Sequence, residues 1–347
     1  MKKLILIVMF LFCMSNEVQA QELTAPSVPS DVQDLMPVET ESFADGLLYV
    51  LKSSIQTLQP EIAAGCGVCL CIIAASMLVS VVSAMPSMTK NVAQLAGCIA
   101  VGCLLLGSTN TMIADATDTV SSLSEYGKLL LPVMATAMAA QGGISGSAAI
   151  YTGTTIFDAV LCTLISKLLA PFVYLYLAMA VAGNAMGEDF LKKLRDFLKW
   201  LTSWSLKTIL YIFTGYMTVT GVVSGSADQT ALKATKLAIS GSVPVVGSIL
   251  SDASEAVLVS AGAIKNAVGV SGLLALCAIA FVPFLRIAVQ YLLLKLTAAV
   301  CGVFGCKPIT ELITDFAGAM GLLLAMTGAI CLILLISLVC FMKGVSG

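Results

Sequence analysis

Apolar segments of membrane-spanning length that carry few or no charged residues recur along this chain, and they restrict its fold more than any other feature. A helix needs about 20 consecutive apolar residues to cross the hydrocarbon core of a bilayer. Six segments approach or exceed that length: Ile62–Ala84, Val92–Ala114, Ile156–Ala182, Leu206–Val223, Ala267–Leu285 and Gly318–Met342. Because a backbone in contact with lipid must satisfy its own hydrogen bonds, each segment is expected to be helical. The sequence therefore predicts an all-α polytopic membrane protein with about six to eight transmembrane or re-entrant helices.

The composition supports the membrane class. Hydrophobic residues make up 59% of the 347 residues and charged residues only 11%, whereas a soluble domain is about half apolar and about a quarter charged. The net charge of −2 gives no reason to expect nucleic acid as a partner. Histidine is absent, which removes the commonest general base and a common zinc ligand. No catalytic residue, metal ligand or cofactor is therefore predicted.

The N-terminus has the pattern of a secretory signal peptide. Lys2 and Lys3 precede an apolar stretch, Leu4–Met14, that is too short to span a bilayer. Val18-Gln19-Ala20 has the small-x-small pattern of a cleavage site. Residues 1–20 are therefore predicted to be a signal peptide, with an uncleaved anchor as the alternative.

The segment after the signal peptide differs from the rest of the chain. Residues 21–45 contain six acidic residues, three prolines and no Lys or Arg, so they are expected to be mostly disordered or loosely helical. Residues 46–59 have an amphipathic pattern. We therefore divide the mature chain into an extracytoplasmic segment, 21–60, and a polytopic membrane domain, 61–347.

Two places in the apolar sequence carry helix-breaking residues. Leu129–Ala140 contains Pro132, is too short to cross alone and is followed by Gly142 and Gly143. The stretch Ser240–Ala253 carries the second set: Gly241, Pro244 and Gly247. Broken backbone is tolerated at membrane depth only where it faces protein or a water-lined cavity. Both places are therefore predicted to be re-entrant hairpins packed inside a bundle.

Four charged residues near or within apolar segments are candidates for a functional role, because intramembrane charges usually have one. Asp252 and Glu255 follow the second break, and the alternative is that they lie at the aqueous end of a short hairpin. Lys167 and Arg286 have apolar residues on both sides and are the better candidates for burial, unless their side chains extend to the interface.

The segment 188–200 has the pattern of an amphipathic helix. Its apolar residues recur at helical spacing, and the opposite face carries four basic residues, Lys192, Lys193, Arg195 and Lys199. A helix of this kind lies in the interface on anionic lipid, and basic residues are enriched on the cytoplasmic side. We therefore expect this helix to lie on the cytoplasmic membrane surface.

An internal repeat would organise these segments. A shift of 112 residues aligns Pro132 with Pro244 and Pro171 with Pro283, and it would make two copies near 92–203 and 204–315. The repeat implies that 266–296 is one kinked span, so that residues 297–316 are cytoplasmic and the C-terminus lies outside. Charge counting instead divides this region into two spans and places the C-terminus inside. We favour the first arrangement.

Short runs in the centre of the chain form a more specific pattern. They are Gly225-Ser226-Ala227-Asp228, Ala231–Lys236, Val243–Gly247, Ser251-Asp252-Ala253 and Lys265–Val270, preceded by Leu131-Pro132 and Gln141-Gly142-Gly143. This pattern resembles the stage III sporulation protein AE family over essentially the whole mature chain. The polytopic layout and the leader peptide agree with that family.

The resemblance implies a role in endospore formation. It implies a channel or export apparatus that links mother cell and forespore, built with other membrane proteins of the stage III sporulation A operon and a forespore partner. The location it implies is the mother-cell-derived outer forespore membrane, and a homo-oligomer is compatible with it. The family has no established catalytic residues to assign.

Two other functional classes are weighed against this one. A secondary transporter or permease would use the broken helices near the bilayer midplane to bind a solute. An intramembrane enzyme would need a nucleophile paired with a base, and we recognise no such pair. The non-enzymatic channel component is therefore the leading hypothesis.

Overall fold

Helices make up nearly all of the chain that the structure describes. The computed structural model describes residues 26, 30–33, 35–36, 43–83, 87–187, 189–242, 247–304 and 306–343, and its side chains are described outside 30–31, 87–91 and 221–265. The helices are α2 (Ser30–Gln33), α3 (Phe43–Ser83), α4 (Ser87–Ala140), α5 (Ile144–Leu164), the π-helix η1 (Ile165–Leu169), α6 (Ala170–Met186), α7 (Asp189–Ser242), α8 (Gly247–Val303) and α9 (Lys307–Lys343).

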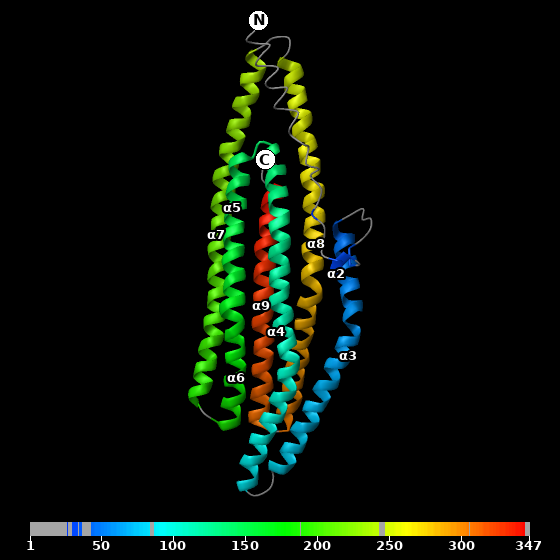
Figure 1. Ribbon diagram of the computed structural model, residues 1–347, viewed down its shortest axis with the longest axis vertical. Helices are drawn as coiled ribbons and strands as arrows, with labels where there is room; N and C mark the ends of the chain where they lie inside the picture. The colour runs from blue at the N-terminus through cyan, green and yellow to red at the C-terminus, as the bar shows by residue number, and fades with distance from the viewer. Residues whose placement is uncertain are drawn as a thin grey trace.

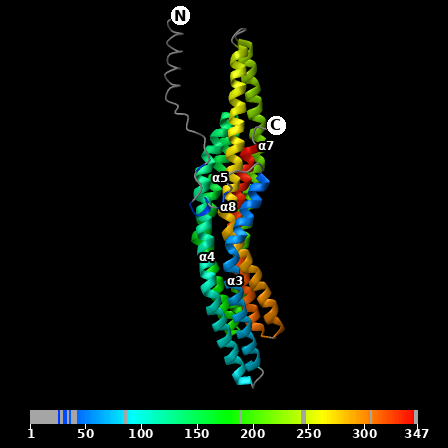
Figure 2. The ribbon, with the colours of Figure 1, turned by 90° about the vertical axis from the view of Figure 1, so that its right-hand side faces the viewer.

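The long helices alternate in direction and form an elongated bundle (Figures 1 and 2). Because α5, η1 and α6 follow one another without interruption, they form one column. The columns α3, α4, α5–η1–α6, α7, α8 and α9 each run once up or down the bundle, although they differ in length. The start of α3 and the end of α9 are therefore the upper ends of their columns. The upper end of the bundle is the upper end in Figure 1, and the α6–α7 and α8–α9 connections lie at the lower end.

Helix α9 lies at the centre of the bundle. It contacts α4, α5, α6, α7 and α8, and Figure 1 shows it between them. Its buried side chains occur along its whole length, from Ile309 and Phe316 through Leu323 and Ile330 to Phe341. A helix that is apolar all round is expected in the core of a bundle, and the apolar last segment of the sequence has that character.

The membrane class predicted from the sequence is confirmed. The described part of the chain contains five helical stretches that are long and apolar enough to cross a membrane: Phe43–Ser83, Val92–Ala140, Ile144–Met186, Asn266–Val303 and Lys307–Lys343. No strand occurs among the described residues. The chain is therefore an all-α membrane protein.

The first expected re-entrant hairpin is wrong. Leu129–Ala140 is the last part of the 54-residue helix α4, and Pro132 lies inside that helix. The polar stretch before it stays helical because Ala116, Val120 and Leu123 are buried at helical spacing on one face. The chain turns only at 141–143, where the backbone N–H groups of Gly142 and Gly143 donate to the carbonyl oxygens of Ala139 and Met138.

The second expected re-entrant hairpin is replaced by a connection between two of the longest helices. Helix α7 runs through Gly241 to Ser242, and α8 begins at Gly247. Pro244 lies outside the described residues. Figure 1 shows that α7 and α8 extend together beyond the other helices at the upper end. Helix-breaking residues therefore separate two continuous helices here and do not interrupt a span.

The amphipathic segment 188–200 is not a separate helix lying along a membrane surface. From Asp189 onward it forms the first turns of α7, which continues for 54 residues. The sequence from Trp200 to Leu206 contains no proline or glycine that would end a helix. The basic face of this segment instead contacts α9, as described below.

Helix α8 decides between the two arrangements of the last third of the chain. It runs without interruption from Gly247 to Val303, with Pro283 inside it. Separate spans on either side of Arg286 are therefore excluded. The expected signal peptide, residues 1–20, lies outside the described residues, and so does most of 21–42.

Candidate functional site: a cross-helix ion-pair cluster

An arginine in α8 joins three helices through its guanidinium group. Arg286 donates from Nη1 to Oδ2 of Asp115 on α4 at 2.6 Å, and from Nη2 to Oε1 of Glu61 on α3 at 2.5 Å. The side chains of Arg286 and Asp115 are 28% and 25% exposed, and that of Glu61 is 41% exposed. A planar guanidinium can bond two carboxylates at once, which a lysine ammonium does less well. We call these three residues the upper ion cluster.

The sequence explains why these residues meet. Glu61 directly precedes the apolar segment Ile62–Ala84, and Asp115 directly follows the apolar segment Val92–Ala114. Because α3 and α4 are antiparallel neighbours, the two carboxylates reach the same level of the bundle. Arg286 on α8 reaches that level from a third helix and neutralises part of their charge.

The upper ion cluster is acidic overall, because one arginine faces two carboxylates. Partly buried ion pairs of this kind are stronger than pairs in water but are costly when one partner is lost. The Arg286 Nε atom is buried and has no hydrogen-bond partner among the described residues. Through its hydrogen bonds to Asp115 and Glu61, Arg286 connects α3, α4 and α8 at a single level of the bundle.

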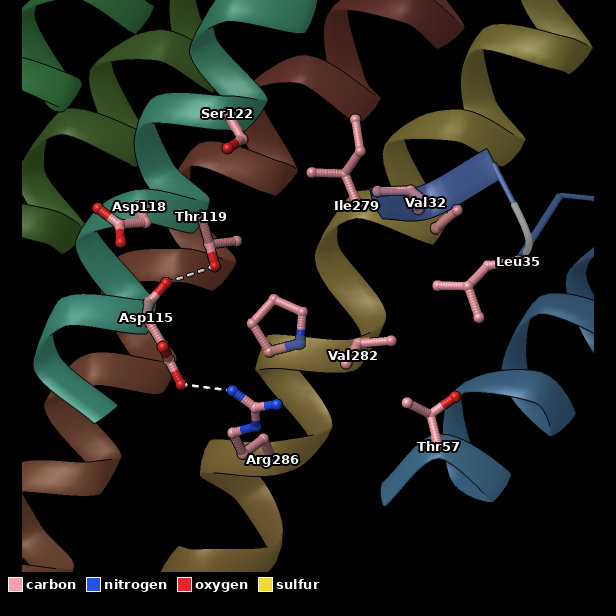
Figure 3. Close-up of a pocket in the computed structure, with 12 residues that line it drawn as sticks. Val32, Leu35, Thr57, Asp115, Asp118, Thr119, Ser122, Ile279, Val282 and Arg286 are labelled. Atoms are coloured by element: carbon pink, nitrogen blue, oxygen red, sulfur yellow. Dashed lines mark hydrogen bonds and ion pairs between the residues drawn. The ribbon is translucent and has the colours of Figure 1, made fainter. Parts of the chain in front are cut away.

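A cavity of about 510 Å³ lies beside the upper ion cluster, between α2, α3, α4 and α8 (Figure 3). Its α4 side is polar, and its α2 and α8 sides are mostly apolar. The lining residues are Val32, Leu35, Thr57, Asp115, Asp118, Thr119, Ser122, Ala278, Ile279, Val282, Pro283 and Arg286. Arg286 also borders a second, smaller cavity of about 30 Å³ on its other side.

The charged residues of the upper ion cluster pair with one another and position α3, α4 and α8. In the described part of the chain, no three His, Cys, Asp or Glu side chains are grouped so that they could hold a metal ion. Thr119 in the cavity donates its hydroxyl to the backbone carbonyl of Asp115 at 2.6 Å, which supports the helix locally.

A second ion-pair cluster lies at the lower end of the bundle, between the start of α7 and the start of α9. Arg195 donates to the carboxylate of Asp315, and both side chains are nearly buried, at 13% and 11% exposed. Asp315 also accepts a hydrogen bond from Nδ2 of Asn184 at 2.8 Å. One turn earlier, Lys192 pairs with Glu311 at 2.8 Å in a more exposed position. We call these residues the lower ion cluster.

The arginine of the lower ion cluster stays charged. Burial by itself lowers the pKa of Arg195, but the neighbouring carboxylates of Asp315 and Asp196 raise that pKa above its usual range. Tyr176 on α6 donates its hydroxyl to the backbone carbonyl of Asp315 at 3.1 Å. The cluster therefore joins α6, α7 and α9 at one level.

The structure brings some of the predicted charges together and separates others. Arg286 is at the centre of the upper ion cluster, whereas Lys167 is exposed on η1. Among the basic residues of the amphipathic segment, Lys192 and Arg195 pair with α9, and Lys193 and Lys199 are exposed. Asp252 and Glu255 belong to α8, but their side chains lie outside the described residues.

Two of the predicted helix-breaking glycines lie in the α4–α5 turn. Gly142 has φ of 92°, a left-handed conformation that favours glycine. Gly143 is the N-cap residue of α5. Neither glycine interrupts a helix.

Sequence reasoning missed the acidic partners. Glu61, Asp115 and Asp315 were not among the charged residues that the sequence singled out. The signal that could have found the first two is their position at opposite ends of consecutive apolar segments. Sequence reasoning also missed Asp158 on α5, a buried carboxylate that accepts a hydrogen bond from Ser124 on α4 at 2.6 Å.

Comparison with known proteins gives a family. The family model described as stage III sporulation protein AE matches residues 32–344. A curated relative, the stage III sporulation protein AE of Bacillus subtilis (strain 168), is 24% identical over 206 residues. That match covers 59% of this chain and 52% of the relative, so the matched region spans about half the length of the relative. No solved structure matches.

Proposed function

Because this chain belongs to the stage III sporulation protein AE family, and so has a role in sporulation, we propose that it is a non-enzymatic membrane component of the channel or export apparatus between mother cell and forespore. In this proposal it lies in the mother-cell-derived outer forespore membrane. Its partners there are the other membrane proteins of the stage III sporulation A operon and a forespore partner.

The observation that carries this proposal is the continuity of the helices. Solute transporters bind their substrate at discontinuous helices near the bilayer midplane. Here α4 and α8 run uninterrupted for 54 and 57 residues, and the centre of the bundle is filled by α9. Two ion clusters fix the columns to one another at separate levels. This architecture supports a rigid scaffold, in which a conducting path would run between chains.

A second observation supports a partner outside the bilayer. Helices α7 and α8 extend beyond the rest of the bundle at the upper end (Figure 1). A long helical pair of this kind can reach a protein that stands well clear of the membrane surface. In the proposed location, this end faces the space between the mother-cell and forespore membranes.

The experiment is an in-cell crosslinking pull-down. A tagged copy of this chain is expressed in sporulating cells, crosslinked after engulfment, solubilised and identified with its neighbours by mass spectrometry. We expect the other operon products and a forespore membrane protein to be enriched. The control is an unrelated polytopic membrane protein with the same tag and expression level. Enrichment equal to that control would refute the proposal.

The transporter alternative rests on the cavity of about 510 Å³ beside Arg286. It predicts that a solute raises the melting temperature of the purified protein by mass action. A screen of amino acids, polyamines and nucleotides against wild type and an Asp118→Asn variant tests it. A stabilising solute whose effect is lost in the variant would favour transport over the scaffold role.

A further inference from the structure

Charged residues are concentrated at two levels of the bundle. The lower level is marked by the lower ion cluster, Lys192, Arg195, Glu311 and Asp315, together with Asn184. The upper level is marked by the upper ion cluster and by two exposed lysines, Lys167 on η1 and Lys207 on α7.

The distance between the two levels is nearly the same on several helices. Cys98 on α4 donates its thiol to the carbonyl of Asn184, and Ser80 on α3 donates to the carbonyl of Phe304, so these residues mark the lower level. Each lower-level residue has an upper-level residue on the same column of the bundle: Cys98 with Asp115, Asn184 with Lys167, Ser80 with Glu61, and Phe304 with Arg286. The two members of each pair are 17 to 19 positions apart in the sequence. In an α-helix this separation corresponds to about 26–28 Å. The hydrocarbon core of a bilayer is about 30 Å thick.

The outer surface between the levels is apolar. On α3 the exposed residues there include Leu70, Leu78 and Val81, each about two-thirds exposed, and no charged residue occurs between Ile62 and Ser83. Helix α4 likewise carries no charge from 92 to 114. Lys199, one turn past Arg195 on α7, and Lys295 on α8 are exposed exceptions. The ammonium group of Lys295 lies 5.9 Å from the Tyr291 ring centroid. A lysine at this depth can extend its head group toward the nearer interface.

The surface above the upper level is different. On α4 the exposed residues there include Asp118, Glu125 and Lys128, which would be costly in lipid. The helices are also too long to be contained in a bilayer, since the 54 residues of α4 extend for about 80 Å. One part of α4 must therefore stand in water, and its exposed charges identify that part as the stretch above Asp115.

We propose that the bilayer surrounds the lower half of the bundle between the two charged levels, and that the upper half projects from the membrane as a helical extension. The extension consists of the later part of α4, α5, most of α7, the first part of α8 and the end of α9. Its core is the end of α9, where Ile330, Ile333, Leu334 and Phe341 are buried. The apolar segment Gly318–Met342 has the length and composition of a membrane span, but in this placement it lies partly in the bilayer and partly in the extension.

The proposed placement assigns the exposed apolar face of α3 and α4 to acyl chains. The face extends over the full distance between the charged levels on both helices, and the charge-free stretches of α3 and α4 end at Glu61 and Asp115, as a lipid contact does. A second copy of the chain is the alternative occupant that the experiment below distinguishes. The depth of the bilayer does not depend on the proposed channel role, whereas the side on which the extension stands does rest on it.

Photocrosslinking tests the depth. The full chain is reconstituted into nanodiscs whose lipids carry a photoactivatable group on the acyl chain, and adducts are mapped by mass spectrometry. We expect adducts on 62–83 and 92–114 and none on 118–136 of α4. Adducts spread over 118–136 would overturn the proposal. Absence of adducts on 62–83 and 92–114 with formation of crosslinked dimers would also overturn it, because a second copy would then cover this face.

Thiol labelling tests the side. A Glu125→Cys variant is expressed in cells before engulfment, when the outer face of the membrane still meets the medium, and the intact cells are treated with a membrane-impermeant maleimide. Labelled positions are identified by mass spectrometry. The native Cys66, Cys71 and Cys103, which are exposed between the levels, serve as internal controls and should be labelled only after denaturation. We expect labelling of residue 125 from outside the cell. Labelling only after the cells are opened would refute the sidedness in the proposed function and leave the membrane depth unchanged, whereas labelling of the native cysteines in opened, undenatured membranes would refute the depth.

Discussion

Arg286 and Asp115 are 171 positions apart in the sequence, yet Nη1 of the arginine donates to Oδ2 of the aspartate at 2.6 Å. Glu61 on α3 accepts the second hydrogen bond. A hydrogen-bonded, partly buried ion pair is costly to break one-sidedly, because the remaining charges lose their partner. These hydrogen bonds connect α3, α4 and α8. The contribution of the charge balance in the cluster to stability can therefore be measured by removing the charges singly and together.

Replacing the arginine should destabilise the protein. In Arg286→Met, Asp115 and Glu61 remain close together without a cation, so we expect a loss of about 2–3 kcal/mol in the free energy of unfolding. Arg286→Lys keeps the charge but not the two-pronged geometry and should lose less. Thermal unfolding in detergent, followed by size-exclusion chromatography, gives the comparison.

The triple variant separates charge from packing. In Arg286→Met with Asp115→Asn and Glu61→Gln, no uncompensated charge remains, so most of the lost stability should return. A triple variant as unstable as Arg286→Met would show that lost packing, rather than unpaired charge, causes the effect.

The two ion pairs of the lower ion cluster should differ in their contribution to the free energy of unfolding. Asp315→Asn leaves the nearly buried Arg195 without its carboxylate and should cost about 2–3 kcal/mol. Glu311→Gln removes the partner of Lys192 in a pair whose side chains are 32% and 49% exposed, and should cost less than about 1 kcal/mol. Thermal unfolding of the two variants in parallel measures the difference, and equal losses would contradict this account of their burial.

A glycine on α5 allows close packing against α7. A Cβ atom at Gly153 would lie 2.0 Å from Cε1 of Tyr216, whose hydroxyl donates to the carbonyl of Ala149 at 2.8 Å. Gly153→Ala should therefore displace the ring and cost about 1–3 kcal/mol. The matched control is Gly215→Ala on α7, where a Cβ atom meets no atom within 4 Å. If both substitutions leave the melting temperature unchanged, the close approach of α5 and α7 is wrong.

The two tryptophans provide a probe that needs no substitution. Trp200 and Trp204 stack with their ring centroids 6.0 Å apart and are 57% and 53% exposed on α7, just above the lower ion cluster. If the bilayer surrounds this level, brominated lipids should quench the tryptophan fluorescence strongly and acrylamide only weakly. Strong quenching by acrylamide with little effect of bromine would place this part of α7 in water.

Much of the fold class could be read from the sequence, because it depends on local properties. Apolar segments of spanning length occur wherever helices cross a membrane, and these segments predicted an all-α membrane protein. Lys167 and Arg286, which have apolar residues on both sides, were candidates for burial; Lys167 is exposed, and the side chain of Arg286 is 28% exposed. The central short runs were specific enough to indicate the family that the family model confirms over residues 32–344.

Helix continuity could not be read in the same way. The stretch 115–128 is polar enough to resemble a loop, and Pro132 and Pro283 resemble helix ends, yet α4 and α8 pass through all of them. The reason is that burial of one face against neighbouring helices outweighs local propensity. The first predicted re-entrant hairpin failed for this reason. The second failed because the break lies between two continuous helices, α7 and α8, and the repeat of 112 residues stays a prediction.

The sequence by itself determined which segments are helical and apolar, and it named Lys167 and Arg286 as two charges among them that were candidates for burial. Only the tertiary structure decided that Glu61 and Asp115 neutralise that arginine and that Asp315 neutralises Arg195. It also decided that α9 forms the core. Local hydrophobicity and helix propensity are properties of neighbouring residues, whereas charge pairing and burial depend on which distant segments the antiparallel packing brings to the same level.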